Sequence, residues 1–202
     1  MTKIWLVRHA ESLAQVGDEN WLDSGLSDRG IQQAMRLHEY FKQIHLHQVW
    51  ISPLVRARET YRLAKLDSLS ACYDSRLIEI AEPHHYAEIL PYETPDDAEA
   101  DTQDAWDKSV YERAKLLVDE LRGVYNQSIC LIGHWGIFSF MLRQFMGVQG
   151  EDVLPFPGTD VSTAVMDNAA VSLLIVDHPN STTRTLRLWN DRHHVADLLS
   201  EL

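Results

Sequence analysis

The chain has little cysteine: Cys72 and Cys130 are the only two in 202 residues. Two cysteines cannot form the disulfide framework that stabilises small secreted domains, and their spacing fits no zinc-binding pattern. Cys130 lies inside an apolar run, where a thiol usually behaves as an inert core group. We therefore expect two reduced thiols without a catalytic role, in a cytoplasmic protein.

The sequence also lacks any apolar run near the roughly 20 residues that a membrane-spanning helix needs. Its first residues, Met1 to Lys3, lead directly into a strand-like segment, with no apolar leader before a cleavage site. Positive charge is scarce as well, because 18 Lys and Arg stand against 30 Asp and Glu, a formal net charge of −12. A surface of this sign repels nucleic acids and anionic membranes, so we expect neither as a partner.

No internal repeat and no low-complexity linker divides the chain. A length of 202 residues suits one domain with a substantial core, and 45% apolar with 24% charged residues is the composition of an ordinary globular protein. Strand-like and helix-like segments alternate along the sequence. This alternation predicts a mostly parallel sheet with helices on both faces, in a single α/β domain over 1–202.

The expected strands are short apolar or β-branched runs, at 3–7, 48–51, 71–73, 128–132, 171–176 and 185–189. The expected helices have apolar residues near helical spacing, at about 28–45, 105–124 and 137–146, with a further helix from Pro53 and a short one from Val195. Ser27 and Ser52 are the predicted N-caps of two of these helices. The proline after Ser52 suits the first helical position, where its missing N–H costs nothing.

Basic side chains follow three of the predicted strands. Arg8 and His9 come directly after the first strand and His134 after the fourth, while Arg56 falls in the first turn of the helix after the second. Because ligands of open α/β sheets bind beyond the carboxyl ends of the strands, we expect these side chains to meet at one anion site. Neighbouring cations should lower the imidazole pKa values and keep one ring nitrogen unprotonated. Guanidinium groups match phosphate oxygens in pairs, so the best guest is a phosphoryl group.

The residues Arg8-His9-Ala10-Glu11-Ser12 resemble the signature of the histidine phosphatase superfamily, the phosphoglycerate-mutase-like enzymes. Further segments match this family in the expected order. They are Leu26-Ser27-Asp28-Arg29-Gly30 with Gln33-Ala34, Ser52-Pro53-Leu54-Val55-Arg56-Ala57 with Thr60, Leu77-Ile78-Glu79, Ile132-Gly133-His134, and Asn190-Asp191 with His193. The resemblance implies a phosphoglycerate-mutase-like three-layer αβα sandwich. The irregular, proline-punctuated stretch at about 80–107 is interpreted as an inserted lid.

The resemblance also implies roles for the matching residues. His9 would be the nucleophile that becomes a phosphohistidine, and Arg8, Arg56 and His134 would hold the transferred phosphoryl group. Glu79 would protonate the leaving oxygen and then activate the attacking water. Further phosphate contacts are expected from Ser12, Gln15 and the backbone N–H of Trp135.

No metal and no cofactor is expected, because phosphoryl transfer needs mainly positioning and charge, which fixed arginines supply. The doublets His84-His85 and His193-His194 do not change this expectation. Adjacent residues in a strand or helix point apart, and no third ligand is spaced to complete a metal site.

The chain departs from the family pattern in two places. Gln15 stands where relatives often have Asn, and its amide would reach a phosphate one methylene displaced. After Glu79 the chain reads Ile80-Ala81-Glu82-Pro83-His84, where many relatives have Gly and then Trp-Glu-Gly. Glu82 is therefore a competing candidate for the general acid.

Three functions stay open: a metal-independent phosphatase of a small phosphomonoester, a cofactor-dependent phosphoglycerate mutase, and a non-enzymatic protein that binds phosphorylated ligands. The intact set of basic residues favours an enzyme. The segment 80–107 has no Lys or Arg and many Asp and Glu. If it overhangs the site it would repel a doubly phosphorylated sugar acid, which favours a phosphatase of monoesters whose remaining part is neutral or cationic. The physiological substrate and the oligomeric state stay open.

Overall fold

The computed structural model of the chain describes residues 1–17, 23–66, 70–79, 103–147, 165–177 and 184–198, with the side chains of 103–109 left aside. The predicted lid at about 80–107 lies outside the described residues, apart from the helical backbone of 103–107. The competing acid Glu82 and the pair His84-His85 also lie outside them. Among the described residues, no helix has both the length and the apolar character needed to cross a membrane.

Six strands form one sheet in the order β3-β2-β4-β1-β5-β6. Their bounds are Thr2–Arg8 (β1), Gln48–Ile51 (β2), Ala71–Tyr73 (β3), Ser128–Gly133 (β4), Val171–Val176 (β5) and Arg184–Asp191 (β6). β1 to β4 are parallel to one another, whereas β5 pairs antiparallel with β1 and β6 pairs antiparallel with β5. The sheet is mostly parallel, as predicted, with two antiparallel pairings at one edge.

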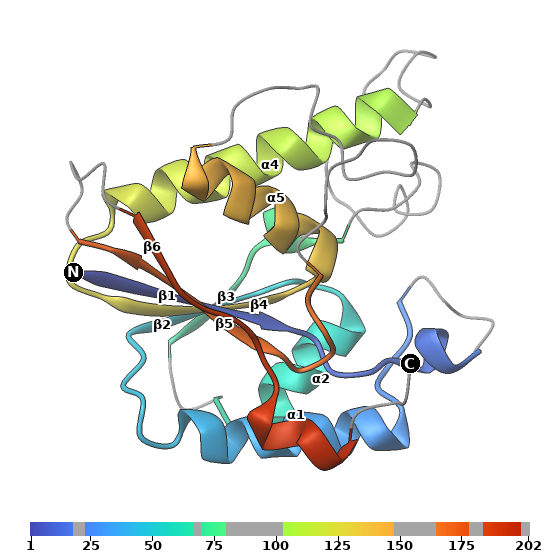
Figure 1. Cartoon of the computed structure of the whole chain (residues 1–202). Helices are drawn as coiled ribbons and strands as arrows, with labels where there is room; N and C mark the ends of the chain where they lie inside the picture. The colour runs from blue at the N-terminus through green and yellow to red at the C-terminus, as the bar shows by residue number, and fades with distance from the viewer. Residues whose placement is uncertain (18–22, 67–69, 80–102, 148–164, 178–183, 199–202) are drawn as a thin grey trace.

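Helices cover both faces of this sheet, as Figure 1 shows. On one face lie α1 (Asp28–Phe41), α2 (Val55–Leu63) and the short 3-10 helix η4 (His193–Leu198). On the other face lie α4 (Gln103–Gly123) and α5 (Trp135–Met146). Two further 3-10 turns, η1 (Leu13–Val16) and η2 (Ser75–Leu77), complete the described elements. The three-layer αβα sandwich is confirmed.

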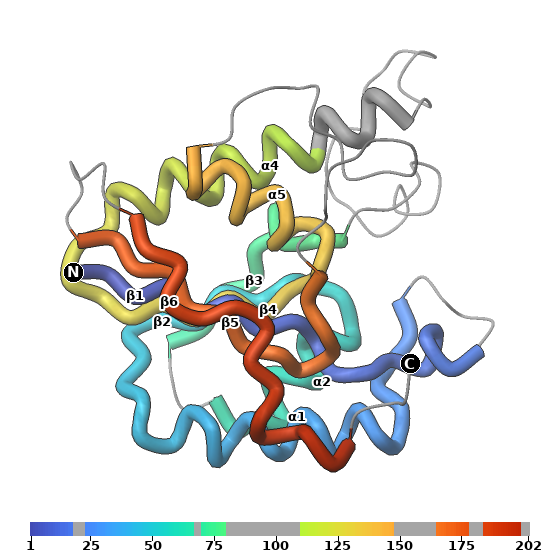
Figure 2. Tube along the Cα trace, in the orientation of Figure 1, coloured from blue at the N-terminus to red at the C-terminus, as the bar shows by residue number. Residues whose placement is uncertain are grey.

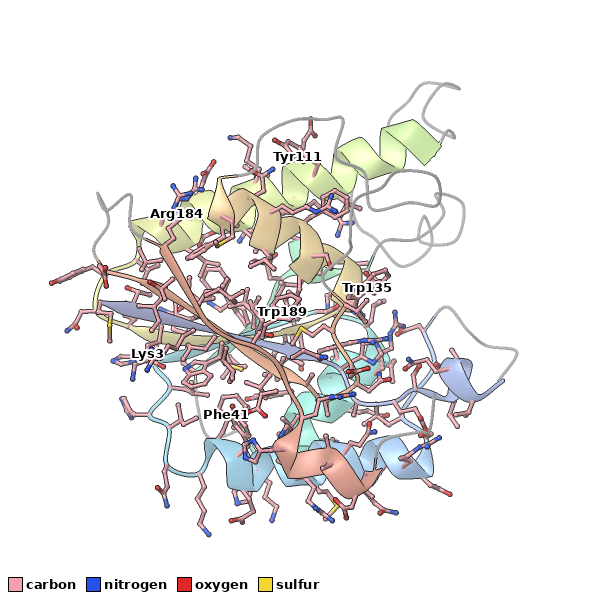
Figure 3. All side chains as sticks on the ribbon, in the orientation of Figure 1. Lys3, Phe41, Tyr111, Trp135, Arg184 and Trp189 are labelled. Carbon is pink, nitrogen blue, oxygen red and sulfur yellow. The ribbon has the colours of Figure 1, made fainter. Side chains whose placement is uncertain are left out.

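Successive side chains of β1 point to opposite faces of the sheet, which explains why two cores form. Ile4 and Leu6 belong to the core under α4 and α5, whereas Trp5 and Val7 belong to the core over α1 and α2. Phe41 of α1, labelled in Figure 3, meets the Trp5 ring edge-on, with the ring centroids 5.8 Å apart. Burying such a side chain contributes about 1.5–3 kcal/mol, so an apolar strand with helices on both sides is the stable arrangement.

The start of α1 agrees with the sequence prediction, whereas the end of α1 and the start of α5 do not. Ser27 caps α1, its hydroxyl accepting the N–H of Gly30 at 3.0 Å, as predicted. The helix ends at Phe41 rather than near His45, because the chain must turn there to bury Leu46 ahead of β2. In the other direction α5 is longer than predicted, since it already begins at Trp135.

The prediction that Ser52 caps α2 is wrong. The helix begins at Val55 with Leu54 as its N-cap, while the Ser52 hydroxyl is bound to His134 Nε2 at 2.8 Å. The cap comes from far away in the sequence: Asp23 Oδ1 accepts the N–H of Val55 at 2.6 Å. The first turn of α2 still contains Arg56, so the expected placement of that cation is correct.

Candidate active site

The sheet brings two histidines to one edge. In the parallel pairing of β1 with β4, Arg8 stands opposite Gly133, so His9 and His134 leave the sheet side by side. Figure 2 shows both strands running toward the end of the sheet where α5 begins. The two imidazole ring centroids are 5.0 Å apart, and the residues are 4% and 0% exposed. The clustering predicted for these two side chains is therefore present.

Two arginines share this edge with the histidines. Arg56 is only 6% exposed, and its charge lowers the pKa of both His9 and His134. Arg8 donates from Nη1 to the carbonyl of Met166, and its Nε has no hydrogen-bond partner among the described residues. Burial lowers the pKa of Arg8, an effect that the nearby carboxylates of Glu79 and Asp167 oppose. The result is a buried region rich in fixed positive charge.

Both imidazoles have a pKa well below the usual value. Burial is the largest cause for each ring, and the charge of Arg56 is the next. The sequence predicted the direction of this shift from the neighbouring cations alone, whereas desolvation contributes more. Both rings are therefore neutral near pH 7, and each keeps one nitrogen lone pair.

The hydrogen bonds of the two rings differ. His9 Nδ1 lies 2.7 Å from the carbonyl oxygen of Ala10, which can only accept, so Nδ1 carries the proton and Nε2 keeps its lone pair. His134 Nε2 lies 2.8 Å from the Ser52 hydroxyl. His134 Nδ1 is buried and has no hydrogen-bond partner among the described residues. Nε2 of His9 is thus available as a nucleophile, and Nδ1 of His134 is available for a hydrogen bond to a ligand.

The loop after β1 uses its own backbone N–H groups for structure. Five consecutive N–H groups, those of residues 9–13, donate to acceptors in five other places at 2.9 or 3.0 Å. The acceptors are Gly133 O, Thr60 Oγ1, Gln33 Oε1, Gln15 Oε1 and Gly25 O, in that order. This differs from a P-loop, whose backbone N–H groups surround the phosphate. An anion at this site would have to be bound mainly by side chains.

Glu11, the acidic residue of the first motif, binds residues at the start of α1. Its buried carboxylate accepts the Ser27 hydroxyl at 2.6 Å and the Arg29 guanidinium at 3.0 Å. A Cβ on Gly30 would lie 1.9 Å from the Glu11 carbonyl oxygen, so only glycine fits there. The segment Leu26 to Gly30 therefore fixes the loop that carries His9.

Glu79 approaches the site from η2. Its Oε1 accepts the N–H of Gly136 at 3.0 Å, in the first turn of α5, and its charge acts on Arg8. The positive end of a helix dipole favours a carboxylate at this position. The structure therefore places the predicted acid at the same edge as the basic cluster.

The remaining predicted contacts lie around His9. The hydroxyl and the backbone N–H of Ser12 bind Gln15 Oε1, at 3.3 and 3.0 Å. Gln15 Nε2 in turn donates to Asn168 Oδ1 at 3.0 Å, and Asn168 Nδ2 donates to the carbonyl of His9 at 3.1 Å. Trp135 is the first residue of α5, half-buried, at the end of the sheet seen in Figure 3. The phosphate contacts of these residues stay predictions.

Two residues near the site carried no signal in the sequence. Asn168 lies in a short turn, and only the fold brings it behind His9, 159 positions earlier. Arg113 lies in the middle of α4, donates to the carbonyl of Ile78 at 2.7 Å, and lowers the pKa of His134. Within the described residues, no three His, Cys, Asp or Glu side chains are grouped to hold a metal ion.

The chain matches the model of the histidine phosphatase superfamily (branch 1) over residues 4–192. Phosphoserine phosphatase 1 of Hydrogenobacter thermophilus is 30% identical over 166 residues, 73% of this chain and 78% of that protein. The adenosylcobalamin/alpha-ribazole phosphatase of Escherichia coli is 26% identical over 215 residues, 94% of this chain and 96% of that protein. The chain spans only 35% of a further relative, the fructose-2,6-bisphosphatase of Saccharomyces cerevisiae, at 28% identity.

Among solved structures, phosphoserine phosphatase of Entamoeba histolytica in complex with 3-phosphoglyceric acid is similar in fold. The TM-score is 0.70 at 20% sequence identity, over 96% of this chain and 100% of that one.

Proposed function

The chain belongs to the histidine phosphatase superfamily and its relatives are phosphatases; from this premise we propose that it hydrolyses a small phosphomonoester through a phosphohistidine on His9, without a metal or a cofactor. The observation that carries the proposal is the pair of buried neutral imidazoles, 5.0 Å apart and beside two arginines. The Nε2 lone pair of His9 is the nucleophile, because Nδ1 donates its proton to the Ala10 carbonyl.

The reaction has two steps, transfer of the phosphoryl group to His9 and hydrolysis of the phosphohistidine. In the first, His9 Nε2 attacks phosphorus, a P–N bond forms, the bond from phosphorus to the leaving oxygen breaks, and Glu79 gives that oxygen a proton. In the second, Glu79 takes a proton from water as the water oxygen attacks phosphorus. The P–N bond then breaks, and phosphate leaves with His9 restored.

The charge of the phosphoryl group is balanced by Arg8 and Arg56, and the neutral ring of His134 adds a hydrogen bond. If the Ser52 hydroxyl donates to His134 Nε2, then Nδ1 carries the ring proton and donates to a phosphoryl oxygen. This assignment uses the buried Nδ1 that has no partner among the described residues. Fixed donors of this kind need no reorganisation during the reaction, which is why they stabilise a transition state well.

The proposed substrates are monoesters whose remaining part carries no net negative charge. The support is the sequence of 80–107, which is acidic and has no Lys or Arg. Phosphoserine and α-ribazole phosphate, for which two of the relatives are named, belong to this class. Phosphoserine and 3-phosphoglycerate form a matched pair, because they differ only in an ammonium or a hydroxyl group at C2.

The experiment is a panel assay of phosphate release, with phosphoserine, 3-phosphoglycerate and several neutral monoesters side by side. We expect release from monoesters, faster from phosphoserine than from 3-phosphoglycerate. A second reaction with 3-phosphoglycerate and 2,3-bisphosphoglycerate tests the mutase. Efficient interconversion of phosphoglycerates would contradict the phosphatase, and binding without turnover of any monoester would indicate a non-enzymatic relative.

A further inference from the structure

Arg113 of α4 holds the backbone directly before Glu79. Its Nη1 donates to the carbonyl of Ile78 at 2.7 Å and to the carbonyl of Arg76 at 3.2 Å. These two carbonyls flank Leu77 at the end of η2. Leu77 is fully buried in the core under α4 and α5, and Ile78 is buried as well. One guanidinium from α4 therefore fixes the segment that ends at Glu79.

The contact between α4 and η2 is reciprocal. The guanidinium of Arg76 contacts α4 in turn, because its Nη2 lies 2.7 Å from Glu120 Oε2. The same Nη2 lies 2.6 Å from Asp74 Oδ2. Glu120 follows Arg113 by seven residues, two turns later on the same face of the helix. Two oppositely directed arginine contacts thus join the helix to η2, and a shift of either element would break both.

Glu79 is anchored through both its backbone and its carboxylate. Its backbone begins at the carbonyl that Arg113 binds, and its carboxylate ends at the N–H of Gly136 in α5. We infer that Arg113 is a positioning residue for the general acid: by binding the Ile78 carbonyl it sets the Glu79 carboxyl at the basic cluster. This inference rests on the proposed function, because it presumes that Glu79 protonates the leaving oxygen.

The expected effect follows from the sensitivity of proton transfer to geometry. A general acid contributes about 10²–10⁴-fold, mostly for leaving groups that need a proton, and a displacement near 1 Å can remove about 10²-fold. Replacing Arg113 with methionine keeps the apolar stem and removes both hydrogen bonds. We expect kcat/KM for an alkyl phosphate to fall about 10- to 100-fold, and that for p-nitrophenyl phosphate to fall less than about threefold.

The experiment compares R113M, E79Q and the double variant on both substrates. Arg122→Met is the matched control, because Arg122 also lies on α4 and donates to a backbone carbonyl at 2.9 Å, but that carbonyl belongs to Gln144 of α5 and not to η2. Inhibition by vanadate is measured for every variant. Because Arg113 binds backbone rather than phosphate, R113M should bind vanadate within about twofold of the parent protein, which also reports that the site is folded.

The inference predicts a selective loss in R113M that disappears in the E79Q background, and no selective loss in R122M. Equal losses on both substrates, or a selective loss that persists without the Glu79 carboxyl, would overturn it. Weakened vanadate binding in R113M would also overturn it, since Arg113 would then support the whole site. The E79Q arm reports separately on the proposed function: without a selective loss there, Glu79 is not the acid and Arg113 has no acid to position.

Discussion

The loop that carries His9 and the segment that carries Glu79 meet at one site but are held in different ways. The backbone N–H groups of residues 9–13 all donate to other parts of the protein, and Glu11 adds a buried contact with α1. The Glu79 carboxylate accepts the N–H of Gly136 in α5, and Arg113 of α4 binds the carbonyl directly before Glu79. The loop of the nucleophile is thus fixed by hydrogen bonds of its own backbone, whereas the position of the acid depends on the packing of α4 and α5.

This difference suggests what each half of the site must do, where the first half is the loop that carries His9 and the second half is the segment that carries Glu79. A nucleophile that attacks and is then released needs one fixed orientation in both steps, which a fully hydrogen-bonded loop supplies. The acid must exchange a proton with a leaving group and then with water. We therefore expect damage to the first half to affect every substrate, and damage to the second half to depend on the leaving group.

The largest effect is expected from Arg56→Gln. The charge of the buried guanidinium lowers the pKa of both imidazoles, and the group is proposed to stabilise the transferring phosphoryl group. Removing such a donor should lower kcat/KM by about 10²–10³-fold on good and poor leaving groups alike. Steady-state kinetics with p-nitrophenyl phosphate and an alkyl phosphate measure this. Arg58→Gln, an exposed arginine in the same helix, is the control, and a similar loss there would remove the special role of Arg56.

The acid half should respond selectively. Glu79→Gln is expected to lower kcat/KM for alkyl phosphates by at least about 10²-fold and to change that for p-nitrophenyl phosphate little, because p-nitrophenolate leaves without a proton. The ratio of the two losses is the measurement. Glu82→Gln provides the comparison, and if the selective loss appears in that variant instead, the acid role belongs to Glu82.

The buried imidazoles should also make stability depend on pH. Their pKa values are well below the unfolded value of about 6.5, so below that pH the unfolded chain binds more protons than the folded one. Stability that is complete well above pH 6.5 is then lost as the pH falls through 6.5 toward the folded pKa values. Between pH 7 and 5.5 the two rings together should cost about 2 kcal/mol.

Urea unfolding at several pH values, compared with a His9→Gln/His134→Gln double variant, isolates this contribution. The variant should lose less stability over the same interval. His194, whose pKa is lowered to about 4 by burial, follows the same trend in both proteins and cancels. Parallel curves for the two proteins would show that the imidazoles are not the cause.

The smallest effect on activity is expected from loosening the loop that carries His9. Thr60→Val keeps the shape of the side chain but removes the acceptor of the Ala10 N–H at 3.0 Å. A buried N–H without a partner should lower the free energy of unfolding by about 1–3 kcal/mol, with a modest loss of activity on every substrate. Thr60→Ser retains the hydroxyl and should therefore keep most of the stability and most of the activity. Selectivity for poor leaving groups in Thr60→Val would contradict the separation of the two halves.

The parts of the site that sequence could predict are those next to a strand end. Arg8, His9 and His134 follow apolar runs that had to become adjacent parallel strands, so their meeting point followed from the pattern. Arg56 was placed correctly in the first turn of α2, although the reason was wrong. Ser52 binds His134 instead of capping that helix, and no local pattern reveals such a bond 82 positions apart.

The parts that sequence could not predict depend on tertiary packing. Arg113 occupies a helix whose residues show only ordinary amphipathic spacing, and its contact with Ile78 exists because α4 packs on η2. Asp23 caps α2 from a loop, and Asn168 reaches His9 from a turn before β5. In each case the donor or acceptor is a common polar residue, and only its position in the fold distinguishes it.

The phosphoenzyme tests the central claim most directly. The protein is mixed with a ³²P-labelled monoester and quenched within milliseconds in base, and the labelled peptide is then mapped. We predict label on His9, stable in base and lost in acid as a phosphoramidate should be, with none in His9→Asn. Label on another residue, or undiminished turnover by His9→Asn, would contradict the account.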